Sequence, residues 1–209
     1  MKSQYRTKIF YNWMNNVLSD PKIGDLRRQL LTHVRGKTLE IGFGTGLNLP
    51  YYPQKMESLI VIDPVMASIV KVADKPAYDF QQMEAENLLF QDSTFDTVVS
   101  TFTLCSVKSI DLTLREIQRV LKPDGRFLFL EHGKSWIKPL SIIQNIVNPI
   151  YNTLAVGCNV NREMEQSLSN NKFQLEQIQH IRFGRQPISG FFYLGVATKK
   201  ENKTGEKSP

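Results

Sequence analysis

Short apolar runs alternate along the chain with stretches of helical periodicity, and this alternation predicts the fold class. Five runs rich in β-branched and apolar residues are predicted as strands, at 38–41, 59–63, 79–83, 95–102 and 126–131. Predicted helices lie between them, and near-continuous apolar strands separated by helices indicate a parallel sheet covered on both faces. Two more strands are predicted at 173–183 and 191–198, so we expect an α/β fold.

The segments outside this alternation set the expected domain boundaries. Residues 1–35 are predicted as two N-terminal helices, the second starting at Asp20-Pro21, a favoured N-cap followed by a favoured first helical residue. Residues 134–172 are interpreted as an irregular apolar insert, and 199–209 as a disordered charged tail. No linker or repeat divides the rest, so residues 1–198 are predicted to form a single domain.

The net charge of +6 changes this picture little, because most of it lies at the two ends. Lys2, Arg6 and Lys8 contribute +3, and residues 199–209 contribute +2 from four lysines and two glutamates. A nucleic-acid enzyme usually carries a basic face on its folded part. We therefore expect no nucleic-acid partner.

Cysteine spacing and hydropathy bear on the compartment. Cys105 and Cys158 are 53 positions apart, which is neither a metal-ligand spacing nor a disulfide framework. The default expectation is a reduced, cytoplasmic protein without a metal. No signal peptide and no apolar stretch of about 18 residues is found, so no transmembrane segment is expected. Peripheral contact with a membrane stays open.

The first chemical signal is a glycine-rich loop after the first predicted strand. Gly42, Gly44 and Gly46 allow sharp bends and close approach to a ligand, and Glu40 precedes them. The spacing is G-x-G-x-G, whereas a dinucleotide loop requires G-x-G-x-x-G. Asp63 ends the second predicted strand, where a carboxylate can accept hydrogen bonds from ribose hydroxyls. The alternative is that Asp63 caps a helix opening at Pro64.

Three segments together resemble the class I S-adenosylmethionine (SAM) methyltransferases. Residues 38–46 resemble motif I, 83–96 resemble G-D-A-E-x-L-P-F…F-D, and 121–127 resemble the L-K-P-G-G turn before the fifth strand. The resemblance implies a Rossmann-like, seven-stranded, mostly parallel sheet with helices on both faces and a reversed last hairpin. It also implies SAM as cofactor and S-adenosylhomocysteine as product. The cofactor-binding residues that it implies are Glu40, Gly42, Gly44, Gly46, Asp63, Glu84, Ala85 and Thr101.

This chain departs from the family pattern in the second of these segments. Met83, Glu84 and Leu89 stand where the family has Gly, Asp and Pro. The resemblance implies that Glu84 accepts from the adenine amino group and that the Ala85 N–H reaches the adenine ring. Because Glu84 is one methylene longer than Asp, Glu86 could compete for this role.

Residues 103–108, 130–132 and 157–163 carry a closer resemblance, to the methyltransferase-like thiol S-methyltransferases and their bacterial phospholipid-methyltransferase-like relatives. It implies methyl transfer to a hydrophobic small molecule, with a thiol as the leading acceptor. Alternatives are N-methylation of phosphatidylethanolamine and C-methylation in quinone synthesis. A SAM-binding regulatory protein and an NAD-dependent oxidoreductase are the alternatives from other classes.

The acceptor side has one candidate catalytic residue. A thiol must lose its proton before it attacks, and His132, predicted to follow the fifth strand, is the candidate base. The alternative is a structural histidine bonded to backbone. Cys105 and Cys158 are interpreted first as buried apolar residues, and no zinc-ligand cluster is expected. The apolar segment 136–158 is predicted to cap the acceptor site and form a hydrophobic pocket, which favours a lipophilic small molecule or a lipid.

Overall fold

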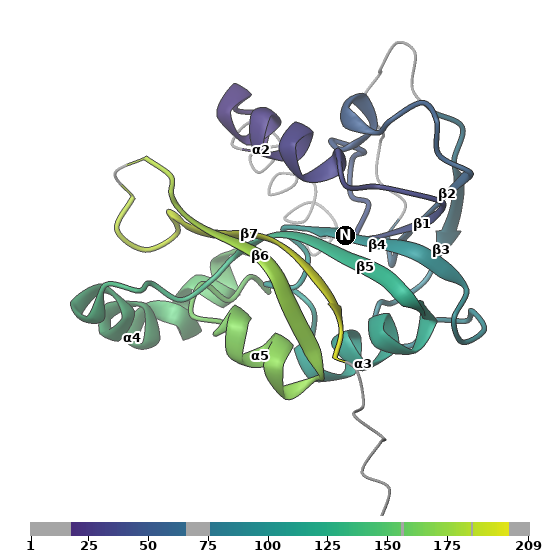
Figure 1. Cartoon of the computed structure of the whole chain (residues 1–209). Helices are drawn as coiled ribbons and strands as arrows, with labels where there is room; N and C mark the ends of the chain where they lie inside the picture. The colour runs from purple at the N-terminus through teal and green to yellow at the C-terminus, as the bar shows by residue number, and fades with distance from the viewer. Residues whose placement is uncertain (1–17, 66–75, 156, 185, 201–209) are drawn as a thin grey trace, which may run out of the picture.

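The computed structural model describes residues 18–65, 76–155, 157–184 and 186–200, and these residues form one seven-stranded sheet with helices (Figure 1). The strands are β1 (Lys37–Ile41), β2 (Ser58–Asp63), β3 (Asp79–Gln82), β4 (Phe95–Thr101), β5 (Leu121–His132), β6 (Phe173–Arg182) and β7 (Phe191–Lys199). The helices are α2 (Pro21–Leu31), α3 (Ile110–Val120), α4 (Lys138–Leu154) and α5 (Met164–Asn170), with a 3₁₀ turn η1 (Leu49–Tyr51).

The strand order is β3-β2-β1-β4-β5-β7-β6, and β7 alone runs antiparallel to both of its neighbours. The strand order reverses in the sheet centre, because β1 pairs in parallel with β2 on one side and with β4 on the other. Such a reversal opens a crevice beyond the carboxyl ends of the strands. The predicted α/β class, the mostly parallel sheet and the reversed last hairpin are confirmed.

Helices cover both faces of the sheet, as predicted. On one face, α2 buries Ile23, Leu30 and Leu31 against the sheet, and full burial of such side chains contributes about 1.5–3 kcal/mol each. The other face carries α3 and α5, which lie on the opposite side of the sheet from α2 in Figure 1. Both α2 and α3 start at a side-chain cap, on Asp20 and Ser109 respectively.

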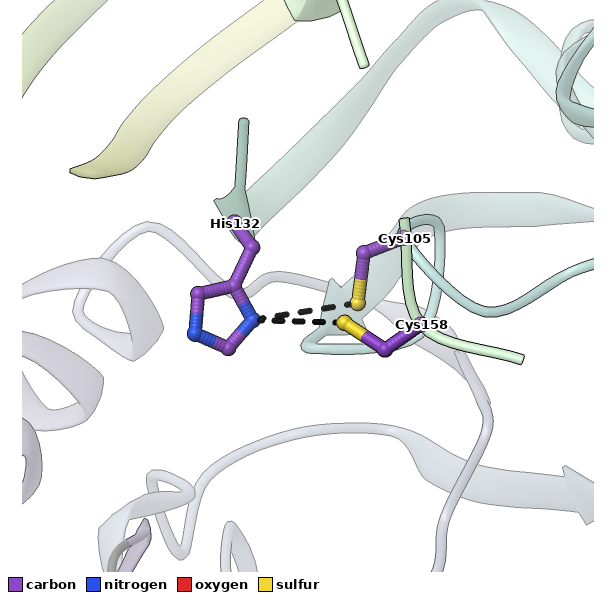
Figure 2. A group of neighbouring side chains, drawn as sticks. All are labelled: Cys105, His132 and Cys158. Carbon is purple, nitrogen blue, oxygen red and sulfur yellow. Dashed lines mark hydrogen bonds between the residues drawn. The ribbon is translucent and has the colours of Figure 1, made fainter. Parts of the chain in front are cut away.

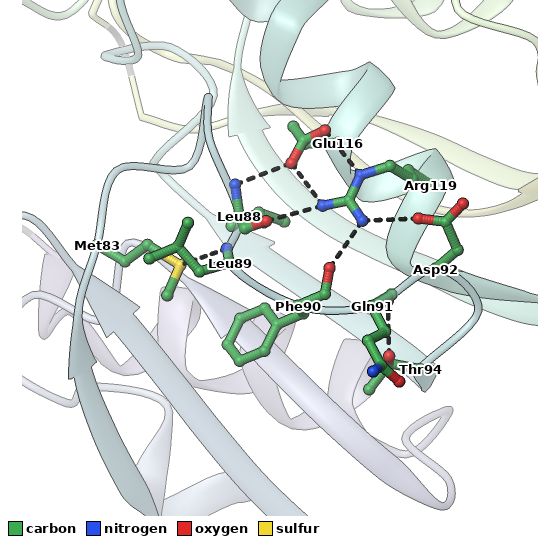
Figure 3. A network of polar contacts seen from close by, with 9 residues as sticks. All are labelled: Met83, Leu88, Leu89, Phe90, Gln91, Asp92, Thr94, Glu116 and Arg119. Carbon is green, nitrogen blue, oxygen red and sulfur yellow. Dashed lines mark hydrogen bonds and ion pairs between the residues drawn. The ribbon is translucent and has the colours of Figure 1, made fainter.

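The segment between β3 and β4 is fixed to α3 by one arginine (Figure 3). The Arg119 guanidinium donates to the backbone oxygens of Leu88 and Phe90 at 2.8 and 2.7 Å, and to the Asp92 carboxylate at 2.8 Å. Glu116 pairs with Arg119 and accepts from the Leu88 N–H at 2.8 Å. Backbone groups of a segment without regular structure are thereby satisfied, which fixes the position of residues 83–86 just upstream.

Three sequence expectations need correction. The predicted turn at 121–125 belongs to β5, which starts at Leu121 with an irregular register to β4. His132 does not follow β5 but ends it. The insert is not irregular, because it contains α4 and α5. Pro149 and several amides in α4 suggest a break, but the 17-residue helix continues through them.

Some expectations fall on parts of the chain that the structure does not describe. The first of the two predicted N-terminal helices, which was expected before Asp20, lies almost wholly outside the described residues. The helix expected from Pro64 lies largely in the undescribed stretch 66–75. The tail beyond Lys200 also lies outside. Among the described residues, no helix has the length and apolar character needed to cross a membrane.

Candidate functional site

A pocket of about 270 Å³ opens at the carboxyl ends of β1, β2 and β4. All of the predicted cofactor residues line it except Gly46, which belongs to the same loop but is absent from the lining. The fold thus brings together four segments that are separate in the sequence. The lining comprises residues 42–45, 47–48, 62–64, 83–86, 101–103 and 106–108, with Leu18, Arg27 and Glu40.

The glycine loop needs glycine for two different reasons. Gly42 has φ +68°, and a Cβ there would lie 2.0 Å from the Thr103 hydroxyl oxygen. Gly44 has φ +56°, but a Cβ there would meet no atom within 4 Å. Gly42 therefore permits close packing of β1 against the turn after β4. Gly44 leaves open space at the pocket wall.

Asp63 ends β2 and is almost fully buried. Its two carboxylate oxygens accept from the backbone N–H groups of Gly44 and Val65, each at 2.9 Å. The bond to Val65 is the capping contact of the alternative interpretation. Each oxygen retains a further lone pair, so the capping role leaves capacity for a ligand hydroxyl. Burial raises the pKa of Asp63, while the two backbone bonds lower it.

A buried polar network lies beneath the pocket. The Glu40 carboxylate accepts from Asn48 Nδ2 and from the Tyr52 hydroxyl, each at 2.8 Å. Burial raises the pKa of Glu40 to about 7, against the opposing effect of these bonds and of Arg27. A nearby positive charge on a ligand would lower this pKa and favour the charged carboxylate.

Arg27 is a pocket residue that the sequence interpretation missed. Its Nη1 donates to Asn48 Oδ1 and to Thr101 Oγ1, the latter at 2.9 Å, which explains the position of Thr101 in the network. The Arg27 Nε is buried and has no acceptor among the described residues. A signal was present, because Arg27 occupies the apolar stripe of α2 four residues after Ile23. A charged residue at a core position of a helix indicates a partner in the interior.

The acidic residues after β3 take different roles. Glu84 lies at the pocket edge, half exposed, and pairs with Lys108 at 2.7 Å. Glu86 accepts from the backbone N–H groups of Lys108 and Ser109 at 2.7 and 3.4 Å. Both face the pocket together with the buried Ala85, but Glu86 is occupied by the turn before α3. Of the two, Glu84 is therefore the one whose partner is an exposed side chain.

Beside this pocket, His132 lies next to both cysteines of the chain (Figure 2). Its Nδ1 is 3.9 Å from Cys105 Sγ and 4.0 Å from Cys158 Sγ, and the three atoms lie within 4.8 Å of one another. The sequence analysis expected no zinc-ligand cluster, but β5, the turn after β4 and the loop after α4 bring three potential metal ligands together here. The expectation that no metal is bound stays a prediction. Contact with Cys158 and burial raise the pKa of the Cys105 thiol well above its usual value.

The turn after β4 is shared by this cluster and the pocket. Phe102, Thr103 and Ser106 line the pocket, whereas Cys105 between them points to His132 (Figure 2). The Phe102 ring lies 5.0 Å from the His132 ring, centroid to centroid. The buried Glu131 carboxylate fixes this turn by accepting from the N–H groups of residues 103, 104 and 105. One turn, held by Glu131, therefore forms a wall of both sites.

The isoleucines of the helix α4 are exposed, and none of them lines the pocket described above. The acceptor pocket predicted from segment 136–158 therefore stays a prediction. Gln144 is instead fully buried, donating to the backbone oxygens of Val160 and Ile188 at 2.9 and 2.8 Å. Within the described part of the chain, α4 thus presents its polar side inward. The exposed large apolar side chains of α4 and the two residues before it are Trp136, Ile137, Ile142, Ile143, Ile146, Ile150 and Leu154.

Comparison with known proteins adds to this geometry. A family model described as a methyltransferase domain matches residues 39–129. The human thiol S-methyltransferase TMT1A is 31% identical over 183 residues, covering 79% of this chain and 75% of that protein. The phosphatidylethanolamine N-methyltransferase of Cereibacter sphaeroides is 31% identical over 138 residues, covering 61% of this chain and 68% of that protein.

Among solved structures, the fold is similar to that of the Burkholderia thailandensis 1,6-didemethyltoxoflavin-N1-methyltransferase with bound 1,6-didemethyltoxoflavin and S-adenosylhomocysteine. The TM-score is 0.65 at 14% identity, with 96% of this chain and 89% of that chain covered. At such low identity the likeness concerns the fold alone.

Proposed function

We propose that this chain, which belongs to the SAM-dependent methyltransferase family, transfers the methyl group of SAM to a hydrophobic thiol. The observation that supports the acceptor part of this proposal is the position of the turn after β4. In this turn, Phe102 lines the donor pocket and also contacts the His132 ring. A reacting group beside His132 would therefore lie next to the donor. The likeness to the human thiol S-methyltransferase TMT1A, which extends beyond the matched domain, supports a thiol over other acceptors.

The cofactor is SAM, and the pocket residues fit its chemical groups. The unpartnered Arg27 Nε suits the carboxylate of the amino-acid moiety, and the buried Glu40 suits its ammonium group. Asp63 has free lone pairs for the two ribose hydroxyls. Glu84 and the Ala85 N–H would meet adenine at the other end. The open space at Gly44 lets the cofactor approach the backbone.

SAM supplies a methyl group on a positively charged sulfur, and that charge is lost during transfer. The work of the protein is to hold donor and acceptor in line and to exclude water. Positioning of this kind contributes on the order of 7–11 kcal/mol. The rigid turn 103–106 would align the two groups, and His132 would accept the thiol proton. Without a base nearby, a thiol with a pKa near ~8.5 is mostly protonated at neutral pH.

The exposed face of α4 supports a hydrophobic acceptor. A helix with an uninterrupted apolar face on one side can lie in a membrane interface, where apolar molecules dissolve. The face combines Ile142, Ile146 and Ile150, each more than half exposed. We propose that this face contacts a membrane peripherally and brings the chain to lipophilic acceptors, in a reducing, cytoplasmic setting. N-methylation of phosphatidylethanolamine is the second candidate, favoured by this face and by the Cereibacter sphaeroides relative.

Label transfer from methyl-tritiated SAM tests the proposal. One reaction contains a lipophilic alkyl thiol, and a parallel reaction contains phosphatidylethanolamine vesicles. We expect label in the thiol product and its loss in His132→Ala, with Asp63→Ala as the control for donor binding. Label only in lipid would favour the second candidate. Label in neither, with SAM bound, would favour a regulatory SAM-binding protein or a different acceptor, such as a quinone precursor.

A further inference from the structure

We propose that Cys105, His132 and Cys158 bind one thiophilic divalent cation, best matched by Zn²⁺, and that the fourth coordination position receives the sulfur of the acceptor. The metal site rests on the geometry of the three side chains. The role of the fourth position rests on the proposed thiol methyltransferase function.

The three candidate ligand atoms are spaced almost as a tetrahedral zinc site requires. With Zn–S near 2.3 Å and Zn–N near 2.0–2.1 Å, tetrahedral geometry separates a sulfur from a nitrogen by about 3.6 Å and two sulfurs by about 3.8 Å. His132 Nδ1 lies 3.9 and 4.0 Å from the two sulfurs. All three atoms lie within 4.8 Å of one another. A contraction of a few tenths of an ångström would bring both nitrogen–sulfur distances to the tetrahedral value.

The ligands are held in place by contacts that do not involve the metal. Asn159 follows Cys158 directly, and its N–H and side-chain amide both donate to the Cys105 backbone oxygen, at 2.8 and 3.2 Å. Asn148 and Asn152 of α4 donate to the Asn159 side-chain oxygen at 3.0 and 3.2 Å. The two cysteine-bearing segments are therefore joined before any ion arrives. A preformed site of this kind binds metal with little reorganisation.

The environment suits a soft cation with thiolate ligands. Both cysteines are buried in a small apolar cluster with Ala155 and Val160. The buried carboxylate of Glu131 contacts the Cys105 backbone and adds negative charge close to the ion. Two thiolates and a neutral imidazole balance a dication, and three protein ligands with one open position are the arrangement of catalytic rather than structural zinc.

A disulfide explains the cluster less well. A bond between Cys105 and Cys158 would use two of the three groups and leave no role for His132, whose Nδ1 points to both sulfurs (Figure 2). It would also require an oxidant. A metal uses all three groups, so the geometry favours a metal.

The metal would change how the acceptor is activated. An incoming thiol that binds the fourth position releases its proton to solvent, because the cation lowers the pKa of its ligand. The bound thiolate sulfur then attacks the methyl carbon, forming a sulfur–carbon bond. The bond from that carbon to the sulfonium sulfur breaks, and its electron pair remains on S-adenosylhomocysteine. The thioether product carries no charge and dissociates. In this scheme His132 is a metal ligand in place of the base described under the proposed function, and the thiol proton goes to water.

Titration of the reduced, metal-free chain with Co²⁺ tests the site without any activity assay. We expect thiolate-to-cobalt charge-transfer absorption that saturates at a single equivalent and disappears when Zn²⁺ displaces the cobalt. Zn²⁺ should also protect both cysteines from alkylation. Absence of the absorption and of protection in the wild-type chain would overturn the proposal, whatever the variants do.

Variants assign the ligands. Cys158→Ser and His132→Ala should weaken cobalt binding at least about a hundredfold, since each removes one of three protein ligands. His33→Ala is the matched control, because His33 lies after α2 and outside the cluster, and it should bind cobalt normally. Equal binding in His132→Ala and the control would remove His132 from the site.

Activity then separates the two proposals. Cobalt binding without thiol methylation would leave the metal site standing and remove both the thiol function and the role of the fourth position. Thiol methylation by a chain that binds no cobalt would leave the function standing and remove the metal site. If the metal binds, an alkyl thiol should shift the cobalt spectrum. An unchanged spectrum would show that the acceptor does not reach the ion.

Discussion

In α3 the side chains of Leu114, Ile117 and Val120 are buried against the sheet, whereas in α4 the buried side chains are those of Ser141 and Gln144. Both helices are amphipathic, but only α3 follows the usual rule that the apolar side packs inward. The docking of α4 relies on hydrogen bonds from amides to loop backbone. The apolar side of α4 is therefore available for contacts outside the described fold. We therefore expect α3 to contribute to stability and α4 to contribute to binding outside the described fold.

Truncation of one isoleucine in each helix tests whether α3 and α4 differ in this way. Ile117→Ala removes a fully buried side chain, and we expect a loss of about 2–5 kcal/mol in the free energy of unfolding. Ile146 is 70% exposed, so Ile146→Ala should change that free energy by less than about 0.5 kcal/mol while reducing vesicle binding. Urea unfolding and vesicle sedimentation measure the two effects. A large loss of stability in Ile146→Ala would mean that the apolar face is buried in the whole protein.

Glu40 is a buried side chain that can carry a charge, whereas the buried Gln144 of α4 is neutral. Burial raises its pKa from the usual 4.5 to about 7, so the folded protein binds the proton more tightly than the unfolded chain. The resulting stabilisation is complete below pH 4.5 and is lost as the pH rises to about 7, a change on the order of 3 kcal/mol. Glu40→Gln should flatten stability between these pH values. An unchanged pH profile in chemical denaturation of this variant would show that Glu40 titrates normally.

Gln144 is the neutral counterpart in α4. Its Nε2 donates to Val160 and Ile188, and its Oε1 accepts from the Ser135 N–H at 2.6 Å. Gln144→Leu leaves these backbone groups unpaired, and we expect a loss of about 2–3 kcal/mol in unfolding free energy. Gln118→Leu in α3 is the matched control, because Gln118 donates only to backbone near the surface. Similar losses in both variants would contradict polar docking of α4.

The smallest expected effect concerns the donor pocket rather than stability. Asp63→Ala removes the carboxylate proposed to hold the ribose, and SAM affinity should fall at least tenfold, about 1.4 kcal/mol. Isothermal titration with S-adenosylhomocysteine gives the affinity directly. Unchanged affinity would leave Asp63 with only its bonds to Gly44 and Val65.

How much could be predicted from the sequence also differs between regions of the molecule. The strands and the glycine loop were predictable because near-continuous apolar runs and short-range spacing determine them. Arg27 was missed although its place in an apolar stripe carried a signal. The cluster of Cys105, His132 and Cys158 carried none, because long-range packing alone brings these residues together. In α4, the polar residues that suggest an irregular segment are those that pack against the rest of the protein. The usual rule that apolar side chains are buried therefore predicts the wrong side of this helix as the inner one.

The turn after β4, clamped by Glu131, has a thermodynamic consequence. The same few residues form a wall of the donor pocket and carry Cys105, so a displacement of the turn by one ligand changes the fit of the other. Coupling of this kind is reciprocal: if SAM raises the affinity for a cation by some factor, the cation raises the affinity for SAM by that same factor. The two sites would then fill together, and methyl donor would be retained when the acceptor can be activated.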